Sequence, residues 1–178
     1  MKTGFFLLFS ALILAVLLQT TVFPHLEIYG VMPNLVLVVV ILTSLSADWR
    51  TTLFLALAGG LSLDFFSTSS FGLFALTFIV IGFSFSFLKS YLFTQANIFV
   101  SLISVLAGTV LCYFIVVLLI GFLSLFKFSV PVITLRENIF IQFSIEAFYN
   151  LVVTVFAFWG LSQNRFSLSD FGPRNRWI

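Results

Sequence analysis

The sequence predicts an all-α integral membrane protein, built as a compact bundle of six transmembrane helices. The first observation is composition: of 178 residues, 61% are hydrophobic and only 8% are charged, whereas soluble domains carry roughly 25% charged residues. The second is that the apolar runs between the charged residues are continuous, and most approach the roughly 20 residues that a membrane-spanning helix needs. A membrane β-barrel would instead show short segments of alternating polarity.

The positions of the charged residues set the bounds of each predicted helix. The second and third helices are short, and the link Asp48–Arg50 between them cannot hold a domain, so they form a tight hairpin. Pro33 is expected in the first turn of the second helix, where its missing amide hydrogen is not needed. The predicted transmembrane domain is 1–164, with helices at about 4–23, 33–48, 51–67, 71–92, 97–124 and 138–162, followed by a basic polar tail at 165–178.

The distribution of Lys and Arg predicts the orientation of the bundle. With the N-terminus in the cytoplasm, the C-terminus is also cytoplasmic, and six Lys or Arg residues fall inside against two outside. The inverted topology would break the positive-inside rule. The inner set is Lys2, Arg50, Lys89, Arg165, Arg174 and Arg176, and the outer set is Lys127 and Arg136.

The sequence argues against an enzyme. It contains one histidine, His25, and one cysteine, Cys112, far apart, which cannot build a zinc site with three or four protein ligands. There is no Walker loop and no nucleophile elbow. We therefore expect no catalytic residues, no cofactor and no metal, and no nucleic-acid partner.

Asp64 is the first polar residue that an apolar helix does not explain. Gly60 and Asp64 lie four positions apart, so they share one helix face, and Gly59 and Gly60 let another backbone approach closely. Two interpretations stay open. Asp64 is either an acid at the wet edge of the membrane or a buried acid that faces a partner helix or a pocket.

Glu146 is the second such residue. Glu146, Asn150 and Thr154 follow at intervals of four, which gives a polar stripe along the last helix that is expected to face protein. Asp64 and Glu146 both fall in the outer half of the predicted bundle, so one outward-facing pocket could contain both. Their protonation is left open.

The first helix carries a possible packing seam. Ala11 and Ala15 form a pair of small residues spaced by three, the spacing that close helix contacts in membranes use. Alanine is common in such helices, so the pair alone identifies no partner.

The order of several short motifs resembles the MreD family of bacterial rod shape-determining membrane proteins. Gln19 near the end of the first helix is followed by "PHLEIYG", "MPNLVLVVV" and "GGLSLDFFSTSSFG". The segment "EAFYN" at Glu146–Asn150 is similar, less specifically, to the last-helix motif of the family. The resemblance is strongest over residues 19–89.

The resemblance implies a non-catalytic scaffold of the cell-wall elongation complex, located as a multi-pass protein in the bacterial cytoplasmic (inner) membrane. The expected partner is MreC, a single-span protein, and through it a RodA-type glycosyltransferase and a penicillin-binding transpeptidase. Gly59, Gly60 and Asp64 would help to form the contact surface. The sequence leaves open whether the protein forms a homodimer and which helix face meets the partner.

A transporter subunit is the alternative. Six short apolar helices also suit the substrate-binding subunit of an energy-coupling vitamin transporter, which uses an Ala-x-x-x-Ala seam like that of Ala11 and Ala15. The MreD fold is itself expected to be similar to that subunit. In this alternative, Asp64, Glu146 and Asn150 would contact the vitamin.

Overall fold

The computed structural model describes residues 2–67, 71–92, 97–125 and 139–163, and the predicted tail lies outside them. These residues form six α-helices and no β-strand, so the predicted all-α class and helix number are confirmed for the described chain. Each predicted bound except the end of the first helix lies within two residues of the observed one. The helices are α1 (Lys2–Leu17), α2 (Leu35–Ser46), α3 (Trp49–Phe66), α4 (Leu73–Leu92), α5 (Ile98–Leu125) and α6 (Ile139–Gln163).

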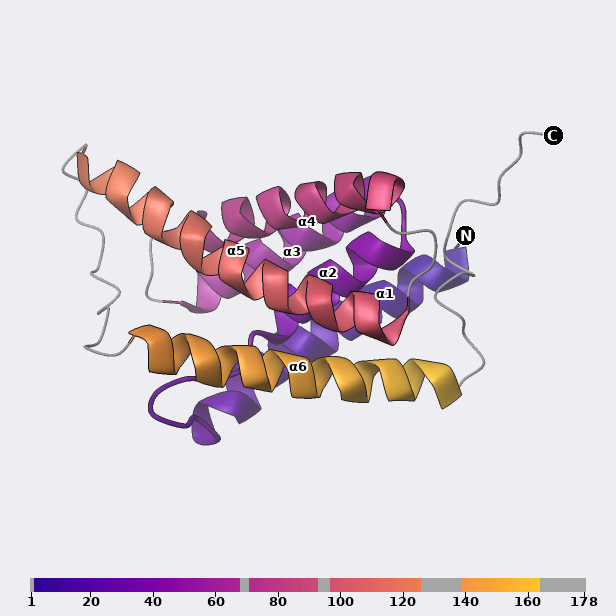
Figure 1. The fold of residues 1–178 in the computed structure, drawn as a ribbon, viewed down its shortest axis with the longest axis horizontal. Helices are drawn as coiled ribbons and strands as arrows, with labels where there is room; N and C mark the ends of the chain where they lie inside the picture. Colours follow the sequence, from indigo (N-terminus) through magenta and orange to yellow (C-terminus); the bar gives the residue numbers. More distant parts are fainter. Residues whose placement is uncertain (1, 68–70, 93–96, 126–138, 164–178) are drawn as a thin grey trace.

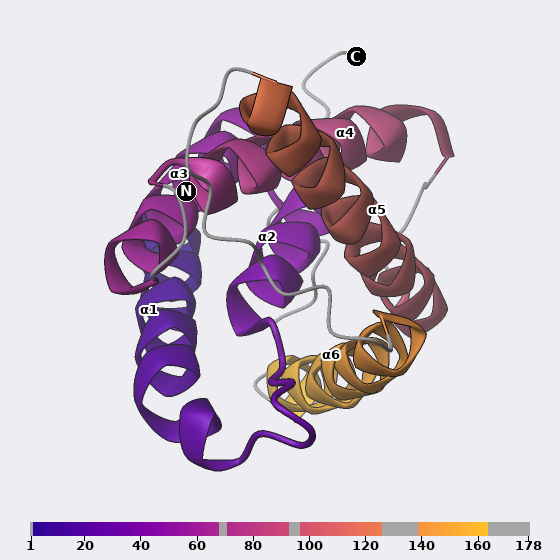
Figure 2. The same cartoon turned by 90° about the vertical axis from the view of Figure 1, so that its left-hand side faces the viewer.

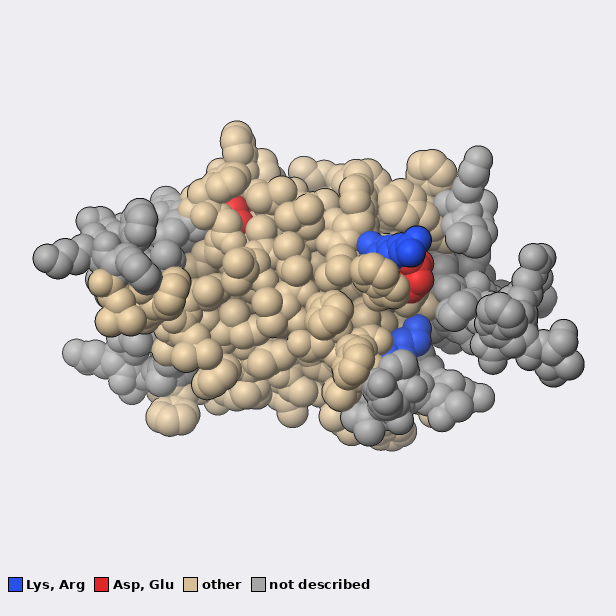
Figure 3. All heavy atoms as spheres, turned by 90° about the horizontal axis from the view of Figure 1, so that it is seen from above, with Lys and Arg blue, Asp and Glu red and all other residues tan. Residues whose placement is uncertain are grey.

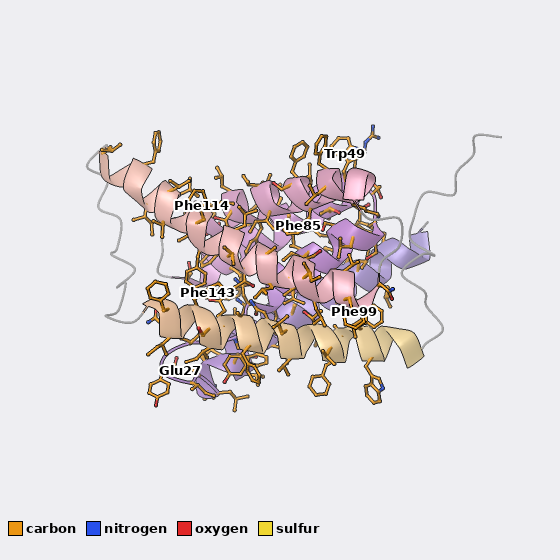
Figure 4. All side chains as sticks on the ribbon, viewed as in Figure 1. Glu27, Trp49, Phe85, Phe99, Phe114 and Phe143 are labelled. Carbon is orange, nitrogen blue, oxygen red and sulfur yellow. The ribbon has the colours of Figure 1, made fainter. Side chains whose placement is uncertain are left out.

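The bundle has two ends, which we name by their connections. The loop end contains the connection from α1 to α2 together with the starts of α2 and α4 (Figure 1). The link end contains Ala47 and Asp48, the two residues between α2 and α3. Figure 4 labels Glu27 and Trp49, which lie at opposite ends. The short link confirms that α2 and α3 form a tight hairpin.

The first helix does not end as a simple α-helix, contrary to the predicted range of 4–23. After Leu17 the chain widens into a π-helical turn, Leu18–Val22, and then tightens into a 3-10 turn, Phe23–His25. The π turn contains Gln19, whose side-chain oxygen accepts a hydrogen bond from the Val36 amide at 3.1 Å. Single π turns of this kind often occur at functional positions.

The prediction that Pro33 lies in the first turn of the second helix is wrong. Helix α2 begins at Leu35, and Asn34 is its N-cap. The Asn34 side-chain oxygen accepts a hydrogen bond from the Leu37 amide at 3.1 Å, which is the contact that makes asparagine a preferred N-cap. Pro33 therefore precedes the helix rather than starting it.

Helix α2 is the centre of the bundle. It has 12 residues, and all of them except Val39 are buried. It contacts each of the other five helices, which surround it in Figure 2. A helix that is apolar on every side is expected in such a position. The main core therefore forms around α2, with Phe78, Leu37 and Ile41 among its largest fully buried side chains.

The surface of the bundle suits lipid. Among the described residues, three segments are long and apolar enough to cross a membrane: Gly4–His25, Ile98–Phe122 and Phe140–Trp159. Large apolar side chains point outward from them, including Phe99 and Phe114 on α5, which are 73% and 60% exposed (Figure 4). The face in Figure 3 is uncharged over most of its length, and most of its charged atoms gather at one end.

Candidate functional site

Asp64, near the end of α3, caps the start of α4. Its two carboxylate oxygens accept hydrogen bonds from the amides of Phe74 and Ala75, at 2.9 and 3.0 Å. The first amides of a helix have no partner inside the helix and carry the positive end of its dipole. Asp64 is only 3% exposed, so in this structure the acid satisfies a buried helix start of the same chain.

The two glycines before Asp64 allow α3 to pack closely against its neighbouring helices. A Cβ atom added at Gly60 would lie 2.4 Å from the Cα atom of Ala75, so α3 and α4 touch backbone to backbone there. A Cβ atom at Gly59 would instead meet side-chain atoms of Val36 and Leu12, at 2.7 and 2.9 Å. Helix α3 is thus packed against α4 on one side and against α1 and α2 on another.

The start of α2 is capped by three neutral side chains from different parts of the chain. Asn150 of α6 accepts from the Asn34 amide at 2.8 Å, Gln19 accepts from the Val36 amide, and Asn34 accepts from the Leu37 amide. Asn150 is fully buried, and its amide nitrogen donates to Thr109 of α5 at 3.1 Å. We call Gln19, Asn34, Thr109 and Asn150 the α2 cap cluster.

Glu146 joins this cluster from the side. One of its carboxylate oxygens accepts a hydrogen bond from the Tyr113 hydroxyl at 2.6 Å. The carboxylate also lies within hydrogen-bonding reach of the side chains of Asn150 and Asn34. The Tyr113 ring packs edge-on against Phe143, with ring centroids 5.6 Å apart. Glu146 therefore ties α5 and α6 to the start of α2.

A pocket of about 250 Å³ opens at the loop end, between the two capped helix starts. The loop beside it is held by Tyr149 of α6, whose hydroxyl donates to the Leu26 carbonyl at 3.2 Å. Its lining is mostly apolar with a few hydroxyl and amide groups: Gln19, Thr20, Pro24, Met32, Leu63, Phe66, Ser67 and Phe74.

The site residues that were predicted from the sequence lie in two separate groups in the structure. Gly60 and Asp64 meet at the start of α4, whereas Glu146 and Asn150 meet at the start of α2. Neither acid is among the residues that line the pocket. The Ala11 and Ala15 pair is also divided, because Ala15 is buried in the core while Ala11 is exposed.

Several residues of the site were not assigned a role from the sequence. Gln19 was noted only for the family resemblance, Asn34 only as part of a motif, and Tyr113 and Thr109 not at all. The available signal was their polarity within long apolar runs, because a buried polar group in lipid needs a partner. This signal indicates that a residue has a hydrogen-bond partner, but it does not identify the partner.

The polar side chains described at the loop end form hydrogen bonds within the protein. The carboxylate and amide side chains there contact helix starts and one another. Among the described residues, no group of three or more His, Cys, Asp or Glu side chains could hold a metal ion. The arrangement holds the rim of a pocket in place.

Comparison with known proteins identifies the family. Residues 1–161 match the family model described as rod shape-determining protein MreD. Neither a curated protein nor a solved structure matches the chain. The family is one of membrane proteins with a shape-determining, structural role, in agreement with the apolar spans described above. Because the match covers nearly the whole chain, the protein belongs to the MreD family of rod shape-determining proteins.

Proposed function

We propose that this protein is a non-catalytic scaffold of the bacterial cell-wall elongation complex, which binds an MreC-type single-span protein through the pocket at its loop end. All six helices cross the cytoplasmic membrane, with both termini inside. Through MreC the scaffold connects to a RodA-type glycosyltransferase and a penicillin-binding transpeptidase. The family assignment supports the role in rod shape, and the pocket is the observation that supports the docking surface.

In the proposed orientation, the pocket faces the periplasm. Arg50 and Lys89 are near the link end, and the positive-inside rule assigns the end with more Lys and Arg to the cytoplasm. The loop end then faces outward, at the level where a single-span partner leaves the membrane. An apolar side chain from a membrane-proximal segment of the partner suits the pocket, because most of its lining is apolar.

In this proposal Asp64 positions the docking surface without touching the partner. Its carboxylate is occupied by the amides of Phe74 and Ala75. Phe74 lines the pocket, as does Leu63, the residue before Asp64. The acid therefore fixes the distance between α3 and α4 on one wall of the pocket.

Filling the pocket tests the docking surface. Met32→Trp adds bulk to a pocket residue that is 40% exposed, so it should lower capture of the MreC-type partner by roughly tenfold or more. Leu26→Trp is the matched control, because Leu26 is exposed on the same loop and does not line the pocket. Capture is measured by co-purification in mild detergent, with thermal unfolding as the check on folding. Equal capture by wild type and a folded Met32→Trp variant would exclude this pocket.

Co-purification from the native host separates the scaffold from the transporter alternative. Recovery of a single-span coiled-coil protein and wall synthases would support the scaffold. Recovery of a coupling membrane protein with two ATPases would support vitamin uptake. Nothing specific favours the transporter among the described residues, since Ala11 and Ala15 do not share an exposed face and Asp64 and Asn150 are bound to backbone amides.

A further inference from the structure

Two cations lie at the link end, and each is held in a defined position. The Arg50 guanidinium lies over the Trp49 ring, 5.4 Å from the ring centroid. The Lys89 ammonium donates to the carbonyl of Ala47, the residue that follows α2, at 3.4 Å. Figure 3 shows Lys and Arg atoms gathered beside acidic atoms at one end of a face that carries few other charged atoms.

The neighbouring acid does not neutralise these cations by pairing with them. Both carboxylate oxygens of Asp48 are occupied by Thr51, one by its hydroxyl at 2.8 Å and the other by its amide at 3.2 Å. Burial raises the pKa of Asp48, but the hydrogen bonds from Thr51 outweigh it, so the pKa lies below its usual value and the acid stays ionised. Within the described residues, no ion pair joins Asp48 to Arg50 or Lys89, and the group carries a net charge of about +1.

We propose that Arg50 and Lys89 form a binding site for the phosphate of an anionic lipid headgroup in the cytoplasmic leaflet. The Arg50 side chain is exposed beside the Trp49 ring, and a guanidinium presents paired N–H groups that match two phosphate oxygens. Lys89 adds a second, point-like positive charge from the last turn of α4. This inference is independent of the docking pocket and uses only the same orientation.

The surroundings favour a lipid over a free phosphate ion. Trp49 is 53% exposed, and tryptophan concentrates at the level of the lipid headgroups. Lys89 is half-buried, so its alkyl chain lies along the apolar bundle while its ammonium reaches the end of α2. A ligand here has its charge at the edge of the bundle and its apolar part beside the helices, as an anionic phospholipid does.

Native mass spectrometry of the full chain in detergent, titrated with phosphatidylglycerol or phosphatidylcholine, tests the site. Wild type should prefer phosphatidylglycerol. Because each basic residue near a membrane surface contributes a similar increment, Arg50→Gln or Lys89→Gln should weaken binding about fivefold, and the double variant about 30-fold. Lys127→Gln removes the same charge outside the described residues and should leave the affinity unchanged.

Four outcomes overturn the proposal. The first is equal affinity for the two lipids in wild type. The second is an Arg50→Gln variant with wild-type affinity for phosphatidylglycerol, which is informative because Arg50 is exposed and its loss leaves the core intact. The third is that inorganic phosphate raises the unfolding temperature of wild type as much as phosphatidylglycerol does, which would assign the site to a free anion. Equal weakening by Lys127→Gln would likewise mean that only net charge matters.

Discussion

Replacing Asp64 by leucine removes the cap of α4 and leaves the shape of α3 nearly unchanged. Leucine has a similar size but no acceptor, so the amides of Phe74 and Ala75 lose their partners. A buried donor without a partner costs about 1–3 kcal/mol, and loss of an N-cap typically costs about 0.5–2 kcal/mol. The Ala75 amide contact is buried and that of Phe74 is partly buried. We therefore expect a loss of about 2–4 kcal/mol in the free energy of unfolding.

Asparagine at the same position separates the two bonds. Its single side-chain oxygen can serve one of the two amides, so Asp64→Asn should cost about half as much as Asp64→Leu. For a chain of this size, 1 kcal/mol corresponds to about 2–4 °C in the unfolding midpoint. Asp64→Leu should thus lower the midpoint by roughly 4–16 °C, and Asp64→Asn by an intermediate amount.

Thermal unfolding in mild detergent, followed by size-exclusion chromatography, measures these midpoints. Glu27→Leu is the control, because it removes an exposed acid from the loop end that caps no helix. Partner capture is measured separately, at a temperature below every midpoint. A wild-type midpoint for Asp64→Leu together with lost capture would refute the capping argument and make Asp64 a direct partner contact.

Three further predictions concern packing, the α2 cap cluster and topology. Gly60→Ala should destabilise by about 1–2 kcal/mol, because overpacking against backbone outweighs the gain in helix propensity. Gly59→Ala meets side-chain ends that can move, so its unfolding midpoint should fall less. Asn150→Leu should cost about 1–3 kcal/mol, since it leaves the first amide before α2 unpaired; a midpoint equal to wild type would contradict this. Cysteines at Tyr29 and Trp49, which are 79% and 53% exposed, should react with impermeant thiol reagents from opposite sides of the membrane, and labelling from one side only would exclude the six-span topology.

The existence and order of the helices could be predicted from the sequence because charges are so expensive in lipid. Among the described residues, every charged residue except Glu146 lies in a connection or within the first or last turn of a helix, so the charges mark where most of the helices begin and end. The cap of α2 was less predictable. Pro33 and Asn34 both suit a helix start, and the choice between them depended on the hydrogen bond from Leu37 to Asn34.

The site was only partly predictable, since its contacts join distant segments. The spacing of Gly60 and Asp64 correctly indicated a helix face shaped for a close neighbour, but nothing in it identified α4 as that neighbour. The π turn that places Gln19 adds no change in hydropathy, so no sequence pattern reveals it. The contact of Asn34 with Asn150 spans 116 positions of the chain, and only the folded bundle brings them together.

The central place of α2 has a consequence for the order in which the chain is assembled. At 12 residues, α2 is shorter than the roughly 20 residues usual for a spanning helix. Asn150, one of the residues that cap its start, belongs to α6, which is synthesised after the other described helices. During insertion, the Asn34 amide at the start of α2 has no Asn150 acceptor until α6 has been synthesised. Loss of α6 would therefore leave the start of the central helix without one of its caps, although the other four helices would still surround it.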